Sequence, residues 1–497
     1  MIILDGESLT LEDVRKVALL RDKVTVSEEA LRKVRHSREQ LMKIKEERVL
    51  YGVNTGFGAL LHKVITKEDE VKLQENLLRS HSSGVGVPFS EEYVRAMLLI
   101  RINSLIQGYS GVSEELIRRS VDLLNSEVVP FVPRYGSVGA SGDLAPLAHI
   151  GLTLIGEGHS YFGDSLHDSK SALAMAGLSP YHLGAKEGVS FINGTAAISG
   201  LLSVDIERTF LTFRSALIAA VLSFEALKGT ANAFRDWAIS IRKQPGQARV
   251  AKAMRLMLED SPSVRETSRF KIQDPYSLRC IPQVYGAVLD TMEYSKEVVE
   301  REINSVTDNP LINEDEVISA GNFHGEPVAL VADFMAIAVT DLGNMIERRI
   351  ARLTDESLSG LPPFLIENNG LNSGYMIPQY TAAALCNRNK TLCFPSTADS
   401  IPTSANQEDH VSMGTNAAIK LSEIVKNFED IVSIELLLGA QALDLAKVHH
   451  GSVAEKARDL IRSKVPKLVH DRPVYTDIQA VKGLIRSGAF LSLCPDF

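Results

Sequence analysis

The tripeptide Ala140-Ser141-Gly142 has residue types that suggest unusual backbone chemistry. Gly142 has no side chain to shield its backbone nitrogen, and the Ala140 carbonyl is flanked by small groups. If the fold bends the tripeptide tightly, the Gly142 nitrogen can attack that carbonyl and close a five-membered ring, because enforced proximity replaces a bimolecular encounter. Loss of water from the ring and from the Ser141 hydroxyl would leave an exocyclic methylidene, an electrophile that no ordinary side chain provides.

The loop that contains this tripeptide, GSVGASGDLAPLAHI at residues 136–150, has two other interpretations. A phosphate-binding P-loop needs the pattern GxxxxGK[ST], and the lysine is missing because Asp143 and Leu144 follow Gly142. The dinucleotide pattern GxGxxG is missing too, and an aspartate at a helix entrance repels phosphate. A helix beginning near Leu144 and capped by Ser141 or Asp143 explains the loop as ordinary structure. The loop alone therefore leaves helix capping and ring closure open.

Other loops along the chain also place polar or aromatic side chains beside glycine. Each is an ordinary turn when taken singly, but loops held by rigid helices are where binding and catalytic sites are usually built. Their joint occurrence therefore indicates a site assembled from several loops. The loops are YGVNTGFG, RSHSSGVG, GSVGASGD, KEGVSFINGT, QDPYSLRC, TDNP, GNFHGEP and TSANQEDHVSMG.

In this order, the loops resemble those of the aromatic amino acid ammonia-lyase family, and most closely its histidine ammonia-lyase branch. The matching motifs run from Tyr51 to about Thr415 and cover most of the chain. The resemblance implies the cofactor 4-methylidene-imidazol-5-one (MIO), formed autocatalytically from Ala140, Ser141 and Gly142, with no metal or nucleotide. It also implies a homotetramer in which loops of three subunits assemble each active site.

The family resemblance also assigns roles to individual residues. Eliminating ammonia requires removal of a weakly acidic β-proton and departure of a poor leaving group. Tyr51 matches the base that takes the proton, which requires that its surroundings lower its phenol pKa. Arg279 matches the arginine that binds the substrate carboxylate. The other matching residues line the MIO site or, for the last, assist ring closure: Asn193, Gln273, Tyr276, Phe323 and Asp143.

Substrate choice depends on Ser80, His81 and Glu408, which are similar to the histidine-selective arrangement of the family. A carboxylate accepts a hydrogen bond from an imidazole N–H, and a histidine can partner the other ring nitrogen. A phenyl ring would leave Glu408 unpaired, which disfavours phenylalanine. The segment RSHSSG also occurs in tyrosine-active relatives, and Arg388 and Phe394 depart from the histidine-branch pattern.

The sequence therefore predicts a carbon–nitrogen lyase that converts L-histidine to trans-urocanate and ammonia, the first step of histidine degradation. The nearest competing hypothesis is the same cofactor acting on tyrosine or phenylalanine, as an ammonia-lyase or a 2,3-aminomutase. Two hypotheses of another class are a helical lyase that uses only side chains and a noncatalytic helical assembly that retains the fold.

Long helical patterns must position these loops. In residues 90–108, apolar side chains recur at four-residue spacing after Ser90, which predicts an amphipathic helix with Ser90 as its N-cap. Residues 196–228 are apolar nearly all round, as in a helix buried among other helices. Similar patterns cover residues 333–353 and 420–447, and strands look short, as in residues 1–4.

The predicted fold is mainly α, a large bundle of long helices with the site-forming loops between them. The family resemblance implies, in addition, a fumarase/aspartase-like helical core. We expect an N-terminal segment, 1–195, that carries the loops of the base and of MIO. Residues 196–450 form the central long-helix bundle, and residues 451–497 form a C-terminal helical segment that packs on the same unit.

Composition excludes several classes of partner. The chain has 497 residues, with 53 basic and 62 acidic side chains and a net charge of −9, which disfavours nucleic acid. The N-terminus has no basic region before a long apolar run, and no stretch of about 18 uncharged apolar residues occurs. We therefore expect a cytoplasmic protein that does not bind membranes. Scattered cysteines without a CxxC pair predict free thiols: Cys280, Cys386, Cys393 and Cys494.

Overall fold

The computed structural model describes residues 1–496 except 57, 61 and 141. Its contacts divide the chain into two compact units. The first comprises Met1–Glu207, Ser295–Asp333 and Pro395–Ile419, and the second comprises Arg208–Tyr294, Phe334–Phe394 and Lys420–Phe497. The predicted segments 1–195, 196–450 and 451–497 follow the order of the chain, whereas each unit combines three separate stretches.

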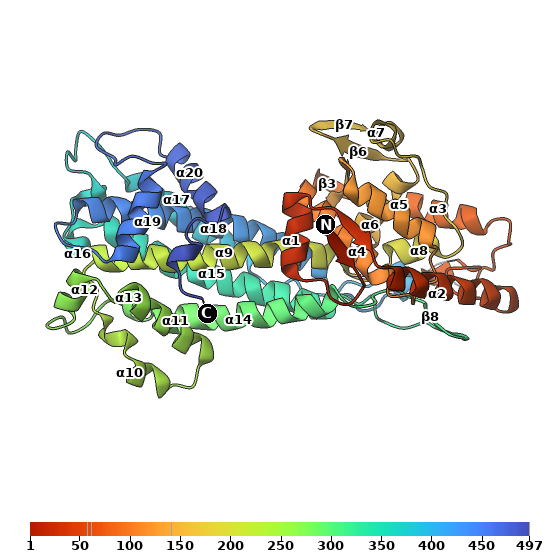
Figure 1. Cartoon of the computed structure of the whole chain (residues 1–497), viewed down its shortest axis with the longest axis horizontal. Coiled ribbons are helices and arrows are strands. Elements are labelled where there is room, and N and C mark those ends of the chain that lie inside the picture. Colours follow the sequence, from red (N-terminus) through yellow and green to blue (C-terminus); the bar gives the residue numbers. More distant parts are fainter. Residues whose placement is uncertain (57, 61, 141, 497) are drawn as a thin grey trace. The chain divides into compact units, whose positions relative to one another are not determined.

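Helices dominate both units (Figure 1), which confirms the predicted mainly α fold. Four long helices have residues in both units: α9 (Ala196–Ala226), α14 (Ile281–Glu302), α15 (Glu326–Thr354) and α18 (Gly414–Leu445). The first unit also contains α1 (Leu11–Leu20), α2 (Glu28–Glu47), α3 (Glu70–His81), α4 (Glu91–Leu105), α5 (Glu114–Asn125), α6 (Leu144–Leu154), α7 (Ser169–Met175), α8 (Glu187–Ile192) and the short 3-10 helices η1 (Gly58–Leu60) and η4 (Ser404–Asn406).

The second unit is helical throughout its described elements. It contains α10 (Asp236–Ser240), α11 (Pro245–Met257), α12 (Pro262–Thr267), α13 (Tyr276–Arg279), α16 (Glu356–Ser359), α17 (Met376–Leu392), α19 (Ser452–Arg462), α20 (Tyr475–Arg486) and the 3-10 helices η2 (Ala231–Phe234), η3 (Pro363–Leu365) and η5 (Leu491–Leu493).

The strands are short and lie in the first unit. β1 (Ile2–Leu4) pairs in parallel with β2 (Val24–Val26), so the predicted strand at the start of the chain is present. The other pairs are antiparallel: β3 (Val85–Pro88) with β5 (Pro133–Tyr135), β6 (His159–Phe162) with both β4 (Val128–Pro130) and β7 (Ser165–Asp168), and β8 (Leu311–Asn313) with β9 (Glu316–Ile318).

Helix α4 differs from its predicted amphipathic form, because every residue from Tyr93 to Leu105 is buried. Two buried arginines allow this, since their guanidinium groups donate to backbone carbonyls instead of reaching water. Arg95 donates to the carbonyls of Val17 and Leu124. Arg101 donates to the carbonyl of Ser190 across 2.5 Å. Ser90 holds the predicted N-cap position, but its side chain makes no capping hydrogen bond.

Helices α9 and α15 are long and apolar enough, by length and composition, to cross a membrane. Most of the apolar window is buried inside the protein in both, 83% in α9 and 61% in α15. The core helices of a folded protein pass the same test, and burial of this extent favours that interpretation. For α9 this agrees with the predicted burial of residues 196–228 among other helices.

Three helices of the first unit provide the framework of the candidate site. α3, α6 and α8 pack against one another, and Figure 1 shows them together with α4 and α5. At Gly151, in the middle of α6, an added Cβ would lie 2.9 Å from the Leu78 side chain of α3 and 3.3 Å from the Phe191 ring of α8. The small residue therefore allows close approach of the three helices.

Candidate active site

A cavity of about 640 Å³ lies in the first unit, over the framework of α3, α6 and α8. Its apolar wall comes from these helices and includes Leu77, Leu144 and Ile192. Two loops complete the lining, one from Tyr51 to Ile65 and one from Ser404 to Glu408. The cavity therefore combines an apolar wall with polar side chains from segments far apart in the sequence. The predicted site residues in its lining are Tyr51, Ser80, His81, Asn193 and Glu408.

The last turn of α3 presents Ser80 and His81 to the cavity. The Ser80 Oγ lies 3.1 Å from the Leu77 carbonyl, to which it donates, and 3.0 Å from the Nδ1 of His81. Burial lowers the pKa of His81, while the Leu77 backbone and the Glu408 charge oppose that shift. His81 is therefore held mainly in its neutral form, in which one ring nitrogen can accept a hydrogen bond.

Tyr51 approaches the cavity from the loop before η1. Its hydroxyl oxygen accepts a hydrogen bond from the Gly58 backbone N–H across 2.9 Å. Gly58 has a φ of +54°, and a Cβ there would lie 2.5 Å from the Ser404 Oγ, so this position favours glycine. The loop that carries Tyr51 thus lies directly against the loop that carries Glu408.

The structure corrects the expectation that the pKa of Tyr51 is lowered. Burial raises the pKa of this phenol, and the negative charge of Glu408 raises it further. The hydrogen bond from Gly58 acts in the opposite direction because it stabilises the phenolate. Within one chain, therefore, burial and the nearby carboxylate favour the protonated phenol.

Glu408 is held by a short local turn. Its backbone pairs with Thr403 in both directions, and the Thr403 hydroxyl donates to Oε2 across 2.5 Å. Its charge raises the pKa of both Tyr51 and His81, which places the carboxylate within electrostatic reach of both side chains. A polar ring bound in the cavity would therefore meet an acceptor with a fixed position.

The glycine-rich loop at 136–143 is held against the segment before α9. Gly142 has a φ of +71° and forms a parallel bridge with Gly194. A Cβ at position 142 would lie only 2.2 Å from the Gly194 carbonyl oxygen, which is backbone and cannot turn aside. Position 142 therefore requires glycine for both conformation and space. Ala140 packs beside Val411 and Met413 in a small apolar cluster.

Asp143 occupies the N-cap position of α6 but makes no capping hydrogen bond there, which corrects the capping interpretation. Its Oδ2 accepts instead from the Ile198 N–H, in the first turn of α9, across 2.8 Å. Its Oδ1 accepts from the hydroxyls of Thr415, at 2.6 Å, and Ser137, at 3.2 Å. Burial raises the pKa of Asp143 to about 6, against the lowering effect of these donors.

Asn193 lies at the C-terminal end of α8, next to Gly194. Its amide nitrogen donates to the Asn309 carbonyl across 2.8 Å. Its Oδ1 is buried and has no hydrogen-bond partner among the described residues. A buried acceptor without a donor is costly, so this oxygen marks a position where a bound group can provide one.

The structure does not bring every predicted residue to this cavity. Ser141 lies outside the described residues. Phe323 is half-buried in the first unit but does not line the cavity as described. Gln273, Tyr276 and Arg279 belong to the second unit, where the Arg279 guanidinium lies 4.5 Å from the centre of the Tyr276 ring.

The sequence analysis did not identify the residues that hold the site residues in place. Gly194 supports Gly142, Thr415 and Ser137 support Asp143, and Thr403 supports Glu408. Most lie inside or beside the glycine-rich motifs, so the motifs gave a signal for them. Their individual roles depend on contacts between segments that are distant in the sequence.

Comparison with known proteins extends over nearly the whole chain. The profile of a family described as aromatic amino acid lyase matches residues 9–463. A probable histidine ammonia-lyase of Thermoplasma acidophilum is 54% identical over 496 residues, covering 100% of both chains. The crystal structure of histidine ammonia-lyase from Trypanosoma cruzi is 40% identical, with a TM-score of 0.92 over 99% of this chain and 94% of that one. Tyrosine aminomutase from Streptomyces globisporus is 37% identical, with a TM-score of 0.94 over 99% and 98%.

Proposed function

This chain belongs to the aromatic amino acid lyase family, and on that premise we propose that it converts L-histidine to trans-urocanate and ammonia. The observation that carries the proposal is the shared cavity of Tyr51, His81, Asn193 and Glu408. It combines a phenol that can act as a base with polar partners for an imidazole ring. We also propose a cytoplasmic enzyme that takes part in histidine degradation.

The residues present fit the MIO group that the family resemblance implies. Ala140 is buried, Gly142 has the conformation and close backbone contact that only glycine allows, and Asn193 offers a buried oxygen without a partner among the described residues. These residues would form or hold the group together with Ser141. When formed, MIO supplies an electrophilic methylidene carbon that captures the substrate.

Asp143 is suited to assist ring closure because it can exchange a proton near neutral pH. Its buried carboxyl, with a pKa of about 6, lies one residue from Gly142. Its hydrogen bonds to α9 and to Thr415 at the start of α18 hold it in one orientation. It therefore positions the loop and provides a proton acceptor beside the Gly142 backbone.

Tyr51 removes the β-proton of the substrate in this proposal. Its raised pKa means that the phenol must lose its proton before it can act as a base. Positive charge near the phenol would favour that loss. The bound substrate provides an ammonium group, and assembly into a homotetramer would bring groups from other subunits.

Glu408 and His81 provide the preference for histidine. Glu408 accepts a hydrogen bond from one N–H of the substrate imidazole, and the largely neutral His81 pairs with the other ring nitrogen. The apolar wall of Leu77, Leu144 and Ile192 packs against the ring faces. A phenyl ring fills the same space but offers no N–H to the Glu408 carboxylate, which lowers transition-state stabilisation.

The decisive experiment compares wild type with Ser141→Ala on L-histidine, L-tyrosine and L-phenylalanine. The product is followed as the conjugated acrylate by near-ultraviolet absorbance, and intact-protein mass is measured beside it. We expect wild type to act on histidine and to lack two water molecules at the peptide containing Ser141. Ser141→Ala should fold but keep the full mass and lose most activity. An unmodified wild-type peptide contradicts the MIO proposal, whereas activity on tyrosine but not histidine contradicts only the substrate.

We further propose a homotetramer whose active sites combine residues from three subunits. The support is that Gln273, Tyr276 and Arg279 match site residues of the family but belong to the second unit of the chain. Tyr51→Phe and Arg279→Ala should each be inactive alone. Co-expressed, they should regain a fraction of wild-type activity, because some shared sites then contain both native residues. No recovery in mixed oligomers, verified by mass, would rule out sharing of these two residues.

A second candidate is a tyrosine lyase or 2,3-aminomutase. The close structural similarity to the Streptomyces globisporus tyrosine aminomutase favours it, as does an apolar wall that accepts any planar ring. The same substrate panel separates the candidates, because an aminomutase releases a β-amino acid without stoichiometric ammonia. Glu408 favours histidine because its carboxylate can accept a hydrogen bond from the ring N–H.

A further inference from the structure

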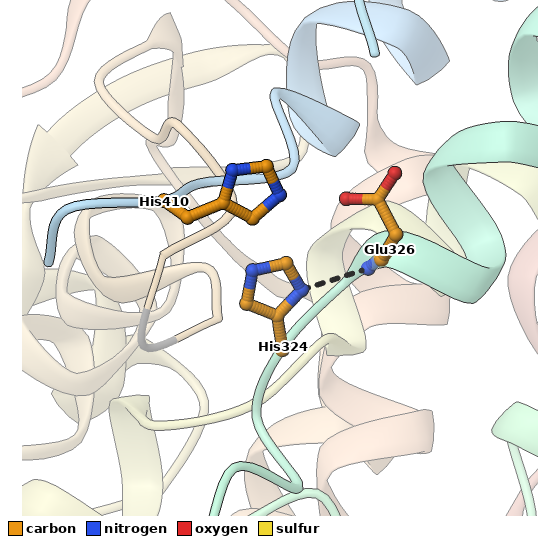
Figure 2. Close-up of side chains that lie close together, drawn as sticks. All are labelled: His324, Glu326 and His410. Atoms are coloured by element: carbon orange, nitrogen blue, oxygen red, sulfur yellow. Dashed lines mark hydrogen bonds between the residues drawn. The ribbon is translucent and has the colours of Figure 1, made fainter. Parts of the chain in front are cut away.

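Three side chains of the first unit form a cluster outside the cavity lining. His324, Glu326 and His410 each offer one ligand atom, and these atoms lie within 4.8 Å of one another. The two imidazole rings stack with centroids 5.7 Å apart and planes inclined by 2°. Figure 2 shows the Glu326 carboxylate beside the edge of the His410 ring, with the His324 ring below that ring.

One hydrogen bond of the cluster shows that a ring nitrogen of His324 is an acceptor. The His324 Nδ1 accepts from the Glu326 backbone N–H across 3.3 Å, so this nitrogen carries a lone pair directed toward the start of α15 (Figure 2). That contact is near the long limit for a hydrogen bond, so little is lost when a cation replaces it. Glu326 Oε2 is buried and has no hydrogen-bond partner among the described residues.

Ordinary helix chemistry explains only part of this arrangement. An acidic residue in the first turn of α15 is favoured by the helix dipole, which accounts for Glu326. It does not account for two imidazoles, from separate segments, that gather around the carboxylate. Two imidazole nitrogens and one carboxylate oxygen are the donor set of many three-ligand zinc sites, in which water completes the coordination.

We propose that His324, Glu326 and His410 bind a divalent transition-metal ion of the zinc class. Ligand atoms around a tetrahedral zinc lie about 3.4 Å apart, given bond lengths of about 2.0–2.1 Å. To reach that geometry, the side chains must move closer together and the two imidazole rings must turn out of their parallel stack, so that both ring planes contain the ion. Sequence spacing predicted no metal site because His410 is remote from the other two residues in the sequence.

The proposed ion is a structural tie between two segments. His324 follows Phe323 directly, and His410 lies two residues after Glu408. Phe323 is predicted to line the MIO site and Glu408 to select the substrate, so one ion would fix both segments to the first turn of α15. The site does not depend on the proposed reaction, because none of its ligands is assigned to substrate or MIO.

The test measures zinc binding by the full-length protein without an affinity tag, after treatment with EDTA and dialysis. Calorimetric titration with Zn²⁺ should show a saturable site with one ion per chain, and Co²⁺ should give visible absorption bands typical of a low-coordinate site. His324→Ala and His410→Ala should each weaken binding by at least about tenfold, as losing one ligand removes more than losing a supporting contact. Glu326→Gln should also weaken binding while preserving shape.

Matched variants keep this result interpretable. His182→Ala removes an exposed imidazole, 89% accessible, and should bind zinc as wild type does. His81→Ala should also retain zinc, which separates the cluster from the active-site cavity. The helical circular dichroism signal verifies that each variant folds. If a histidine variant fails to fold, zinc binding by Glu326→Gln tests the proposal instead. Absence of saturable binding in wild type, or equal binding by wild type and Glu326→Gln, would overturn the proposal.

Discussion

The loop at 136–143 and the loop at 51–60 both place glycines beside a candidate reactive group, but different parts of the chain hold them. Asp143 is fully buried and accepts hydrogen bonds from the first turns of α9 and α18, at Ile198 and Thr415. Tyr51 is half-buried and bonds to Gly58, seven residues along the same loop. The first loop depends on distant segments, whereas this hydrogen bond of Tyr51 is local.

This contrast matches the different demands of the two proposed roles. Ring closure in a backbone requires one enforced conformation, since proximity replaces a bimolecular encounter. Proton removal and substrate recognition require side chains that can adjust to a bound ring. Substitutions in the first loop should therefore abolish formation of the cofactor, whereas those in the second should change turnover or specificity and leave the cofactor in place.

Gly142→Ala should have the largest effect. The added Cβ would lie 2.2 Å from the Gly194 carbonyl oxygen, so the loop must move and ring closure should fail. We expect intact-protein mass to show no loss of water and activity to be undetectable. Gly177→Ala is the matched control, because Gly177 has nearly the same φ, +72°, but no atom lies within 4 Å of an added Cβ. This substitution should lower the free energy of unfolding by only about 1 kcal/mol and retain activity. Normal water loss in Gly142→Ala would show that the loop tolerates displacement.

Tyr51→Phe should come next. Removing the phenol hydroxyl eliminates the proposed base, which should lower kcat by about 10²–10⁴-fold. The mass deficit of two waters should persist, because ring closure takes place within the backbone of residues 140–142, whereas the Tyr51 hydroxyl accepts a hydrogen bond from Gly58 in its own loop. Mass spectrometry and steady-state kinetics on the same preparation test this separation. If Tyr51→Phe lost the mass deficit, formation of the cofactor in the 136–143 loop would depend on the Tyr51 hydroxyl, and the proposed separation of roles would be wrong.

Asp143→Asn should alter how stability depends on pH. Burial raises the pKa of Asp143 from 3.8 to about 6, so the folded state holds an extra proton between these values. The stabilisation from that proton is complete well below pH 3.8 and is lost as the pH rises through about 6. Wild type should therefore lose roughly 2 kcal/mol of unfolding free energy relative to Asp143→Asn between pH 4 and pH 7. Denaturant unfolding at a fixed protein concentration measures the free energy of unfolding of both proteins at each pH. If the difference between them did not change with pH, the pKa of Asp143 would not be raised by folding.

Glu408→Gln should have the smallest effect, confined to specificity. Replacing a charged acceptor with a neutral amide oxygen weakens the hydrogen bond to the substrate ring, which should lower kcat/KM for histidine by about tenfold. The ratio of phenylalanine to histidine activity should rise, because a neutral amide disfavours an apolar ring less than a carboxylate does. Glu12→Gln, at an exposed ion pair with Arg15, is the control and should change neither rate. An unchanged ratio would assign histidine preference to other residues.

Some features of the fold and of the candidate site could be predicted from the sequence, and others could not. The mainly α fold and the family were predicted and are confirmed, because helical periodicity and ordered motifs are properties of the chain itself. The same periodicity misjudged α4, since burial of Arg95 and Arg101 depends on carbonyls that other segments provide. Likewise, capping by Asp143, one of the interpretations that the sequence left open, does not occur, because the first turn of α9 binds its carboxylate instead.

The sequence by itself determined which chemical groups are available: a tripeptide of small residues, a tyrosine beside glycines, and a histidine and a glutamate. Only the tertiary structure decided their environments. Burial raised the pKa values of Asp143 and Tyr51, and contact with Gly194 made position 142 accept glycine alone. It also brought His324, Glu326 and His410 together. Desolvation, charge proximity and steric exclusion depend on neighbours in space, which sequence spacing does not specify.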